Sequence, residues 1–257
     1  MILIDKLSYS SRLRFKNPTV KFIFAVLTLL ICVLSRSIFV SSITLLVMGS
    51  LIVLYNGTSL SYFFKLMTIP LVFLLLSTVA IIINISSQPL SAFAIPFFQW
   101  YITSSVESLI FACRLILTAL SAVSCLYFLS LSTPITDILM VLKKLHCPEL
   151  LIELMLLIYR FIFVLLDLAA ALSISQKSRL GNKDFKTSCK SLGSLLAVLL
   201  VRSFQKSGKL YDAMESRCYS GRILALPEAY TIKNAELIFI FAFEIMLITI
   251  AIFVAIY

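Results

Sequence analysis

The sequence predicts an all-α integral membrane protein: a helical bundle of about five spans, with further long helices in the cytosol or at the membrane interface. Hydrophobic residues make up 61% of the 257 residues and charged residues only 13%, with a mean hydropathy of +1.06. Charged residues alone make up about a quarter of an ordinary soluble domain. Apolar runs of about 17 to 25 residues recur along the chain, which is the length that a helix needs to cross a bilayer.

The N-terminal segment is predicted to lie in the cytoplasm. Four basic residues precede the first long apolar run, opposed by a single acidic residue: Lys6, Arg12, Arg14 and Lys16 against Asp5. The positive-inside rule places such a segment on the cytoplasmic side. The first two spans, residues 20–34 and 38–55, then form a tight hairpin that turns at residues 35–37.

The third and fourth spans are predicted at residues 71–85 and 106–129. Residues 59–67 are too short to cross a membrane, so they are predicted to be an interfacial piece that ends before Pro70. Residues 86–105 contain no Lys or Arg, and their aromatic residues are typical of a membrane interface: Phe93, Phe97, Phe98, Trp100 and Tyr101. This segment is therefore expected outside, and residues 1–130 form a four-span bundle.

Residues 131–233 are predicted to be a distinct region that carries most of the excess positive charge. Thr133-Pro134 predicts a helix start, because a hydroxyl suits the N-cap and proline suits the first helical position. This short helix is expected to lie along the inner membrane surface. Two long helices follow, residues 149–179 and 184–219, and they are separated by a break at Gly181. Residues 234–257 form the last span, which leaves the C-terminus outside.

Each long helix is predicted to end on an arginine motif. The motifs are Ser178-Arg179-Leu180 and Ser216-Arg217-Cys218. A helix C-terminus attracts cations by about 0.3–1 kcal/mol through its dipole, so charge alone would make both arginines simple decoration. The repeated context, with a serine before each arginine and a glycine within a few residues, favours a functional interpretation. Antiparallel helices of about 30 residues would hold the two arginines at opposite ends, about 45 Å apart, which suits two separate binding sites.

Several charges interrupt the apolar stretches. Glu153, Arg160 and Asp167 are seven residues apart, which places them on one stripe of a helix. Because a charge that faces lipid is costly, we expect them to face protein, toward one another or toward Arg114 and Arg202. A structural seam of ion pairs is favoured over a transport pathway. An inward pairing is also expected for Glu244 in the last span.

The sequence argues against catalysis, a metal site and a resident cofactor. His146 is the single histidine, the six cysteines form no CxxC pair, and no serine has a base beside it. The nearest approach to a phosphate loop, Gly208-Lys209, lacks the other glycine and the Ser or Thr that such a loop needs. If the protein takes part in active transport, another subunit must hydrolyse ATP. The net charge of +10 lies beside membrane spans without a nucleic-acid motif, so lipid headgroups and an acidic protein partner are expected and nucleic acid is not.

Three further segments join the arginine motifs in a resemblance to a known family. They are Asp5–Arg14 with Asn17-Pro18, Ser132–Asp137, and Leu151–Phe163. Over nearly its whole length the chain resembles the transmembrane coupling (T) component of energy-coupling factor (ECF) transporters, and within that group the cobalt-type CbiQ family. The wider group often has Ala-Arg-Ser or Ala-Arg-Gly where this chain has Ser-Arg-Leu and Ser-Arg-Cys.

The resemblance implies a non-catalytic subunit of an ATP-driven uptake transporter for cobalt or nickel in the bacterial inner membrane. It implies that Arg179 and Arg217 end coupling helices that dock on two ATPase subunits, expected to be a homodimer. It also implies a metal-capturing membrane S component and a small accessory membrane subunit as partners. The alternative is a stand-alone secondary transporter or channel that uses the intramembrane charges.

Overall fold

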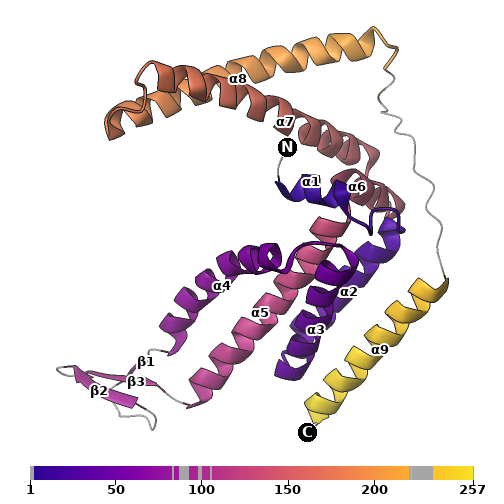
Figure 1. Cartoon of the computed structure of the whole chain (residues 1–257), viewed down its shortest axis with the longest axis vertical. Coiled ribbons are helices and arrows are strands. Elements are labelled where there is room, and N and C mark those ends of the chain that lie inside the picture. The colour runs from indigo at the N-terminus through magenta and orange to yellow at the C-terminus, as the bar shows by residue number, and fades with distance from the viewer. Residues whose placement is uncertain are drawn as a thin grey trace. The chain divides into compact units, whose positions relative to one another are not determined.

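A computed structural model describes residues 3–82, 84–86, 93–97, 100–104, 106–219, 221 and 234–256. Helices dominate these residues (Figure 1). The chain divides into two compact units, which we describe separately. The first comprises residues 2–138 and 229–257, and the second comprises residues 139–228.

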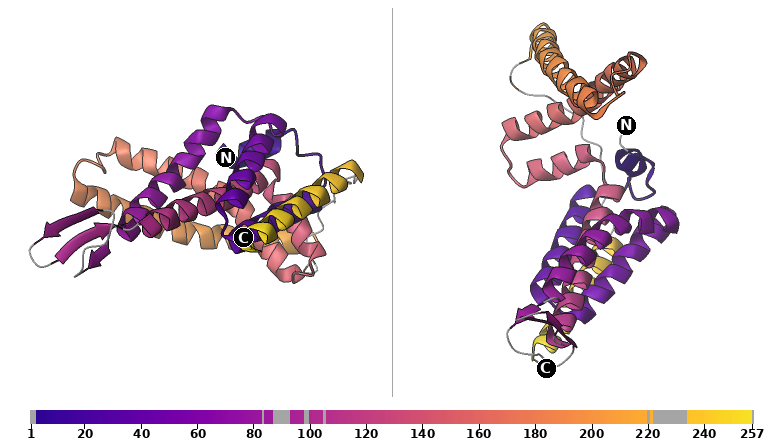
Figure 2. Two further views of the ribbon diagram at one scale, coloured as in Figure 1. Left: turned by 90° about the horizontal axis from the view of Figure 1, so that it is seen from below. Right: turned by 90° about the vertical axis from the view of Figure 1, so that its left-hand side faces the viewer.

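The first unit is a bundle built around one central helix. Its helices, in chain order, are α1 (Leu3–Ser10), α2 (Pro18–Ser35), α3 (Ile38–Ser50), the π-helical turn η1 (Leu51–Tyr55), α4 (Leu60–Ile82), α5 (Val106–Ser132) and α9 (Asn234–Ile256). Helix α5 packs against α1, α2, α3 and α4, while α9 packs on α2 (Figures 1 and 2). The predicted hairpin of the first two spans is confirmed, since α2 ends at Ser35 and α3 begins at Ile38.

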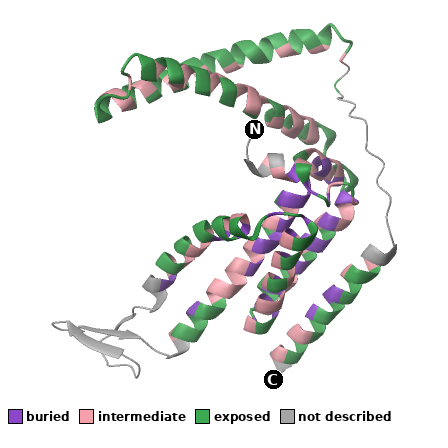
Figure 3. Ribbon diagram, viewed as in Figure 1, coloured by how far each residue is buried: buried purple, intermediate pink, exposed green. Residues whose placement is uncertain are grey.

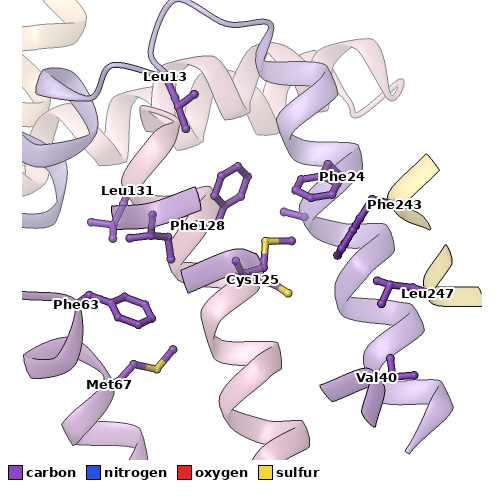
Figure 4. Packing of buried hydrophobic residues seen from close by; sticks show 13 residues of the cluster. Leu13, Phe24, Val40, Phe63, Met67, Cys125, Phe128, Leu131, Phe243 and Leu247 are labelled. Atoms are coloured by element: carbon purple, nitrogen blue, oxygen red, sulfur yellow. The ribbon is translucent and has the colours of Figure 1, made fainter. Parts of the chain in front are cut away.

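The core of this bundle is apolar and aromatic (Figure 4). The ring of Phe24 meets the rings of Phe128 and Phe243 edge-on, with both pairs of centroids 5.8 Å apart. Such edge-to-face pairs add to the stabilisation from buried area. Around this core, α2, α3 and α4 carry many large apolar residues that are exposed, and Figure 3 marks the exposed positions along the ribbon. Extensive apolar exposure of this kind is typical of a surface that faces lipid.

Helix α4 corrects the prediction for residues 59–85. We expected a short interfacial piece before Pro70 and a separate span after it, but one 23-residue helix runs through the proline. Proline has no N–H to donate to the carbonyl four residues earlier, here that of Leu66. The hydroxyl of Tyr127 on α5 donates to that carbonyl instead, at 3.2 Å. A neighbouring helix thus replaces the hydrogen bond that the proline removes.

A small antiparallel sheet connects α4 and α5, and it is the departure from an all-α fold. Its strands are β1 (Asn84–Ser86), β2 (Phe93–Phe97) and β3 (Trp100–Ser104), in the order β1-β3-β2. Four of the five aromatic residues predicted for an interface fall in β2 and β3, whereas Phe98 lies outside the described residues. Aromatic residues favour strands, but such short strands leave little periodicity to detect.

Three charged side chains are buried among the described residues of the first unit, and each takes part in a hydrogen bond: Lys21, Asp137 and Glu244. Glu244 is 6% exposed, and its Oε1 accepts a hydrogen bond from Thr28 Oγ1 at 2.7 Å, which confirms the expected inward pairing. Lys21, also 6% exposed, was not singled out from the sequence. Its Nζ donates to the carbonyls of Leu13 and Ser132, at 3.0 and 2.9 Å. This lysine therefore ties the segment after α1 to the end of α5.

The second unit consists mainly of two long helices, α7 (Glu149–Ser178) and α8 (Phe185–Glu215). Helix α6 (Ile135–Lys144), predicted from Thr133-Pro134, crosses the boundary between the units. Neither α7 nor α8 buries a residue along its described length (Figure 3). In Figure 1, α7 and α8 cross near the end where they are joined and separate toward the other end.

Seven helices in the described part of the chain are long and apolar enough to cross a membrane. They are α2, α3 with η1, α4, α5, α7, α8 and α9. The prediction of a helical, multi-pass membrane protein is confirmed. The predicted count of five spans is not, because α7 and α8 also satisfy the criteria of length and composition.

Candidate functional site

The first arginine motif forms the end of α7. The N–H of Gly181 donates to the carbonyl of Gln176 at 2.8 Å, and the N–H of Leu180 donates to that of Lys177 at 3.1 Å. Leu180 has a φ of 57°, in the left-handed region. This pair of nested hydrogen bonds around a left-handed residue is the Schellman motif, which closes many helices. Arg179 is therefore held on a defined turn.

The second arginine motif closes α8 in the same way. The N–H of Tyr219 donates to the carbonyl of Met214 at 3.0 Å, and that of Cys218 donates to Glu215 at 2.9 Å. Cys218 has a φ of 59°. Each arginine thus directly precedes the left-handed residue of a Schellman motif. The similarity of the two motifs in sequence extends to their backbone geometry.

The side chains around the two turns leave the guanidinium groups available. Ser178 Oγ donates to the carbonyl of Ile174, and Ser216 Oγ donates to that of Ala213, both at 3.0 Å. The serine hydroxyls are thus occupied by their own helices. Arg179 and Arg217 are exposed and form no ion pair within the described residues. Each motif presents a single cation with five N–H donors.

Near the loop between α7 and α8, the two backbones approach closely. Gln176 Nε2 donates to the carbonyl of Ser191 at 2.9 Å, and Ser191 Oγ donates to the carbonyl of Gly181 at 2.8 Å. A Cβ atom at position 181 would lie 2.8 Å from both the Gln176 oxygen and Ser191 Oγ. The turn at the end of α7 therefore requires glycine here, and the bond from Ser191 joins this turn to the first part of α8.

At the other end of the pair, a side chain joins the two helices. Tyr219, two residues after Arg217, donates its hydroxyl hydrogen bond to Glu153 Oε2 at 3.0 Å. This bond raises the pKa of Tyr219, because the proton it must lose is shared with a carboxylate. Glu153 lies near the start of α7. The contacts at both ends show that the helices run antiparallel and that their arginine motifs lie at opposite ends.

Within the described residues, the structure gives no ion pair between members of the predicted charge seam. Glu153 binds Tyr219, whereas Arg160, Asp167 and Arg202 are exposed and make no ion pair within the described residues. Arg114 is an exposed residue of the first unit. The seam stays a prediction for the assembled protein.

No group of three or more His, Cys, Asp or Glu residues that could hold a metal ion occurs in the described part of the chain. All six cysteines are free thiols. His146, in the loop before α7, is exposed and has a φ of 61°.

Sequence reasoning missed the contacts that hold the two arginine motifs in place. Gln176 and Ser191 are ordinary polar residues on long helices and gave no signal. Tyr219 directly follows the second arginine motif, but its acceptor is 66 residues away in the sequence. Its position gave one usable signal, because Tyr219 and Gly181 occupy the same place, two residues after each arginine.

The chain is similar in sequence to a family of cobalt transport proteins. A family model described as CbiQ, cobalt transport protein, matches residues 10–226. An uncharacterised protein of Methanocaldococcus jannaschii is 34% identical over 252 residues, which cover 97% of this chain and 92% of that protein. The cobalt transport protein CbiQ of Salmonella typhimurium is 28% identical, over 85% of this chain and 97% of that protein. A Methanocorpusculum labreanum protein, named as a fused cobalt transport protein CbiMQ, is 32% identical over 88% of this chain, which spans 38% of that longer protein.

Proposed function

The chain belongs to the CbiQ family of cobalt transport proteins, and from this premise we propose that it is the coupling (T) subunit of an ATP-driven ECF-type metal uptake transporter. Family membership and the apolar helices make it a multi-pass membrane component of cobalt transport and not a catalytic enzyme. The proposal adds the mechanism. Two partner ATPase subunits hydrolyse ATP, and this chain transmits their movement to a membrane subunit that captures the metal.

The observation that carries the proposal is the repeated helix ending. Arg179 and Arg217 each stand on a Schellman turn of the same geometry. The two turns lie at opposite ends of the antiparallel pair of α7 and α8. Since α7 has 30 residues, these ends are about 45 Å apart along the helix direction. A dimeric ATPase would offer two equivalent binding sites, one on each subunit. Each guanidinium would pair with a carboxylate or backbone carbonyls in one ATPase subunit.

The mechanism uses the stiffness of the helices. When the ATPase subunits approach one another on binding ATP, their two docking sites move, and Arg179 and Arg217 move with them. A helix closed by a hydrogen-bonded turn transmits this displacement along its axis rather than fraying at its end. The exposed apolar residues of α7 and α8 then present a surface for the metal-capturing subunit.

The partners of this chain are part of the same proposal. The fused CbiMQ relative joins a CbiQ-like segment to a further segment in one polypeptide, which supports a membrane partner that works beside this chain. We assign to that S component the capture of cobalt or nickel, and we include the small accessory membrane subunit. The lipid bilayer surrounds the bundle.

The orientation is also proposed. The basic N-terminal segment lies in the cytoplasm of the cell membrane, α2 to α5 and α9 cross it, and residues 131–233 form the coupling region on the cytoplasmic side. In this arrangement α7 and α8 do not cross the membrane, although they are long and apolar enough to do so. The unpaired charges of the predicted seam would then meet partner subunits.

The test is to replace both arginines with glutamate in the complete transporter. Arg179→Glu with Arg217→Glu should abolish co-purification of the ATPase subunits, because the charge reversal removes the donors and repels the same acceptors. Lys206→Glu is the matched control, since it reverses an exposed charge on α8 away from both ends and should leave assembly intact. The elution profile of the purified chain alone checks that the double variant is folded.

Retained assembly and Co²⁺ uptake in the double variant would refute the coupling function. Flux of Co²⁺ through the purified chain alone in liposomes would instead favour the stand-alone transporter. We expect no such flux.

A further inference from the structure

The two ends of the α7–α8 pair are held by contacts of different kinds. At the loop end, Gly181 and Ser191 bring the backbones together, and the covalent loop joins them as well. At the far end, the described contact between the helices is the Tyr219–Glu153 hydrogen bond. The helices separate toward this end (Figure 1), so a long side chain is needed to span the gap.

Positions 181 and 219 are equivalent in the two Schellman turns. Each supplies the N–H that closes its turn, to Gln176 in one case and to Met214 in the other. Each also contacts the opposite helix, Gly181 through its carbonyl and Tyr219 through its hydroxyl. The residue after each left-handed position therefore sets the distance of its arginine motif from the neighbouring helix.

The length of α8 makes the far contact mechanically important. Helix α8 has 31 residues, which corresponds to about 46 Å. A rotation of about 10° around the contact at Ser191, which lies about 36 Å from the C-terminal end of α8, would displace that end by about 6 Å. Arg217 lies at that tip, so the angle between the helices decides where it stands relative to Arg179.

We propose that Tyr219 is a positioning residue whose hydrogen bond to Glu153 fixes the angle between α7 and α8, so that displacement of Arg217 by its partner moves both helices together. This inference rests on the proposed function. A hydroxyl that donates to a carboxylate forms a charge-assisted hydrogen bond, which is stronger and more directional than a neutral one. Without this hydrogen bond, α8 can change its angle to α7 while α7 stays in place. The movement of the ATPase subunits is then not transmitted from α8 to α7.

The functional test uses Tyr219→Phe in the complete transporter, reconstituted in proteoliposomes. We expect normal assembly and ATP hydrolysis, with a several-fold fall in the amount of Co²⁺ transported per ATP. Tyr211→Phe is the matched control, because this tyrosine is also on α8 and is 60% exposed, and it should behave as wild type.

Substitutions of the acceptor separate this role from a general loss of stability. Glu153→Gln keeps an oxygen that can accept from Tyr219, so it should retain most of the transport per ATP. Glu153→Ala should reproduce the loss seen in Tyr219→Phe. Combining Glu153→Ala with Tyr219→Phe should be no worse than either change alone, because both remove the same bond.

The ionisation of Tyr219 gives a spectroscopic signature of the bond. The hydrogen bond to Glu153 raises the pKa of Tyr219 above the ordinary tyrosine value of about 10. The bond is therefore fully present below that value and is lost as the pH rises through the raised pKa. The difference in tyrosinate absorbance between wild type and Tyr219→Phe reports the ionisation of Tyr219. It should appear at a higher pH than for an ordinary tyrosine, and Glu153→Ala should return the pKa of Tyr219 toward the ordinary value.

The outcomes distinguish this inference from the proposed function. If the arginine variants lose assembly while Tyr219→Phe keeps the wild-type ratio of Co²⁺ to ATP, the positioning role is refuted and the coupling function stands. If the arginine variants assemble and transport normally, both are refuted. A lowered ratio in Tyr219→Phe, retained in Glu153→Gln and accompanied by the late tyrosine titration, supports the positioning role.

Discussion

At the scale of single residues, the two positions after the arginines are unusual. Leu180 and Cys218 adopt a left-handed backbone conformation, although neither is glycine. This conformation costs an L-residue about 1–2 kcal/mol, which is why glycine dominates at this place in Schellman turns. Leu180 is also 71% exposed, so burial of its side chain does not offset the strain. Such strain often marks functional sites.

The strain at Leu180 gives a prediction. Leu180→Gly should stabilise the end of α7 by about 0.5–1 kcal/mol, because the relieved strain of about 1–2 kcal/mol exceeds the entropic cost of glycine, about 0.5–1 kcal/mol. Amide exchange at positions 180 and 181 should slow by about twofold to fivefold.

Alanine at the same position provides the control. Leu180→Ala keeps a Cβ and therefore keeps the strain, so its exchange should match the wild type. Slower exchange in both variants would show that loss of the leucine side chain, and not the backbone conformation, is responsible.

The sequence could predict the arginines but not what positions them. Arg179 and Arg217 stand in local motifs that combine a helix end, a serine and a nearby glycine. The contact of Tyr219 with Glu153 depends on how two helices cross, which no local pattern encodes. Lys21 was overlooked for a similar reason, because its carbonyl acceptors belong to Leu13 and to the distant Ser132.

At the scale of helices, the hydrogen bond that Pro70 removes from α4 is replaced by a neighbouring helix. The carbonyl of Leu66, left without its usual partner by Pro70, accepts a hydrogen bond from Tyr127 on α5. The interaction stabilises α4 itself and its packing on α5. It also explains why proline ended the predicted helix but does not end the real one.

This contact can be tested by removing one oxygen atom. Tyr127→Phe should destabilise the protein by about 1–3 kcal/mol, because it leaves the Leu66 carbonyl without a partner in an apolar environment. Thermal unfolding in detergent measures the effect. Tyr55→Phe, at a 60% exposed tyrosine, should have almost none.

A second substitution identifies the mechanism. In a Pro70→Ala background, residue 70 regains an N–H that can donate to Leu66, so Tyr127→Phe should cost clearly less. An equal cost in both backgrounds would mean that Tyr127 stabilises the protein by some other contact.

Most helix boundaries were predictable from sequence within a few residues. Helix α7 was expected at 149–179 and spans Glu149–Ser178, because proline precedes it and a glycine follows it. Helix α1 and the three strands were not anticipated. They are short, and short elements depend on their surroundings more than on their own sequence pattern.

At the scale of the whole molecule, hydropathy identifies apolar helices but does not decide which of them cross the membrane. Among the described residues, seven helices meet the criteria of length and composition, and the proposed arrangement uses five of them as spans. Adding α7 and α8 as a pair leaves the C-terminus on the same side. The loop between them distinguishes the two arrangements, because it is cytoplasmic with five spans and external with seven.

Labelling of this loop gives the corresponding prediction. In a chain whose exposed cysteines 113, 189 and 218 are replaced by serine, Lys183→Cys should react with an impermeant maleimide only after the cytoplasmic face is made accessible. Arg12→Cys serves as the cytoplasmic reference, and Arg36→Cys, in the turn between α2 and α3, serves as the external one. Labelling of Lys183→Cys in intact cells would establish seven spans.

The similar C-terminal turns of α7 and α8 affect how many copies of this chain a complex needs. Two antiparallel helices that end in the same type of turn carry their C-terminal arginines at opposite ends of the pair. The chain therefore carries two similar arginine motifs, one at each end of the helix pair. A homodimer has a dyad and presents two identical surfaces. One copy of this polypeptide can occupy both surfaces at once, which permits a complex with a single coupling chain for each pair of identical neighbours.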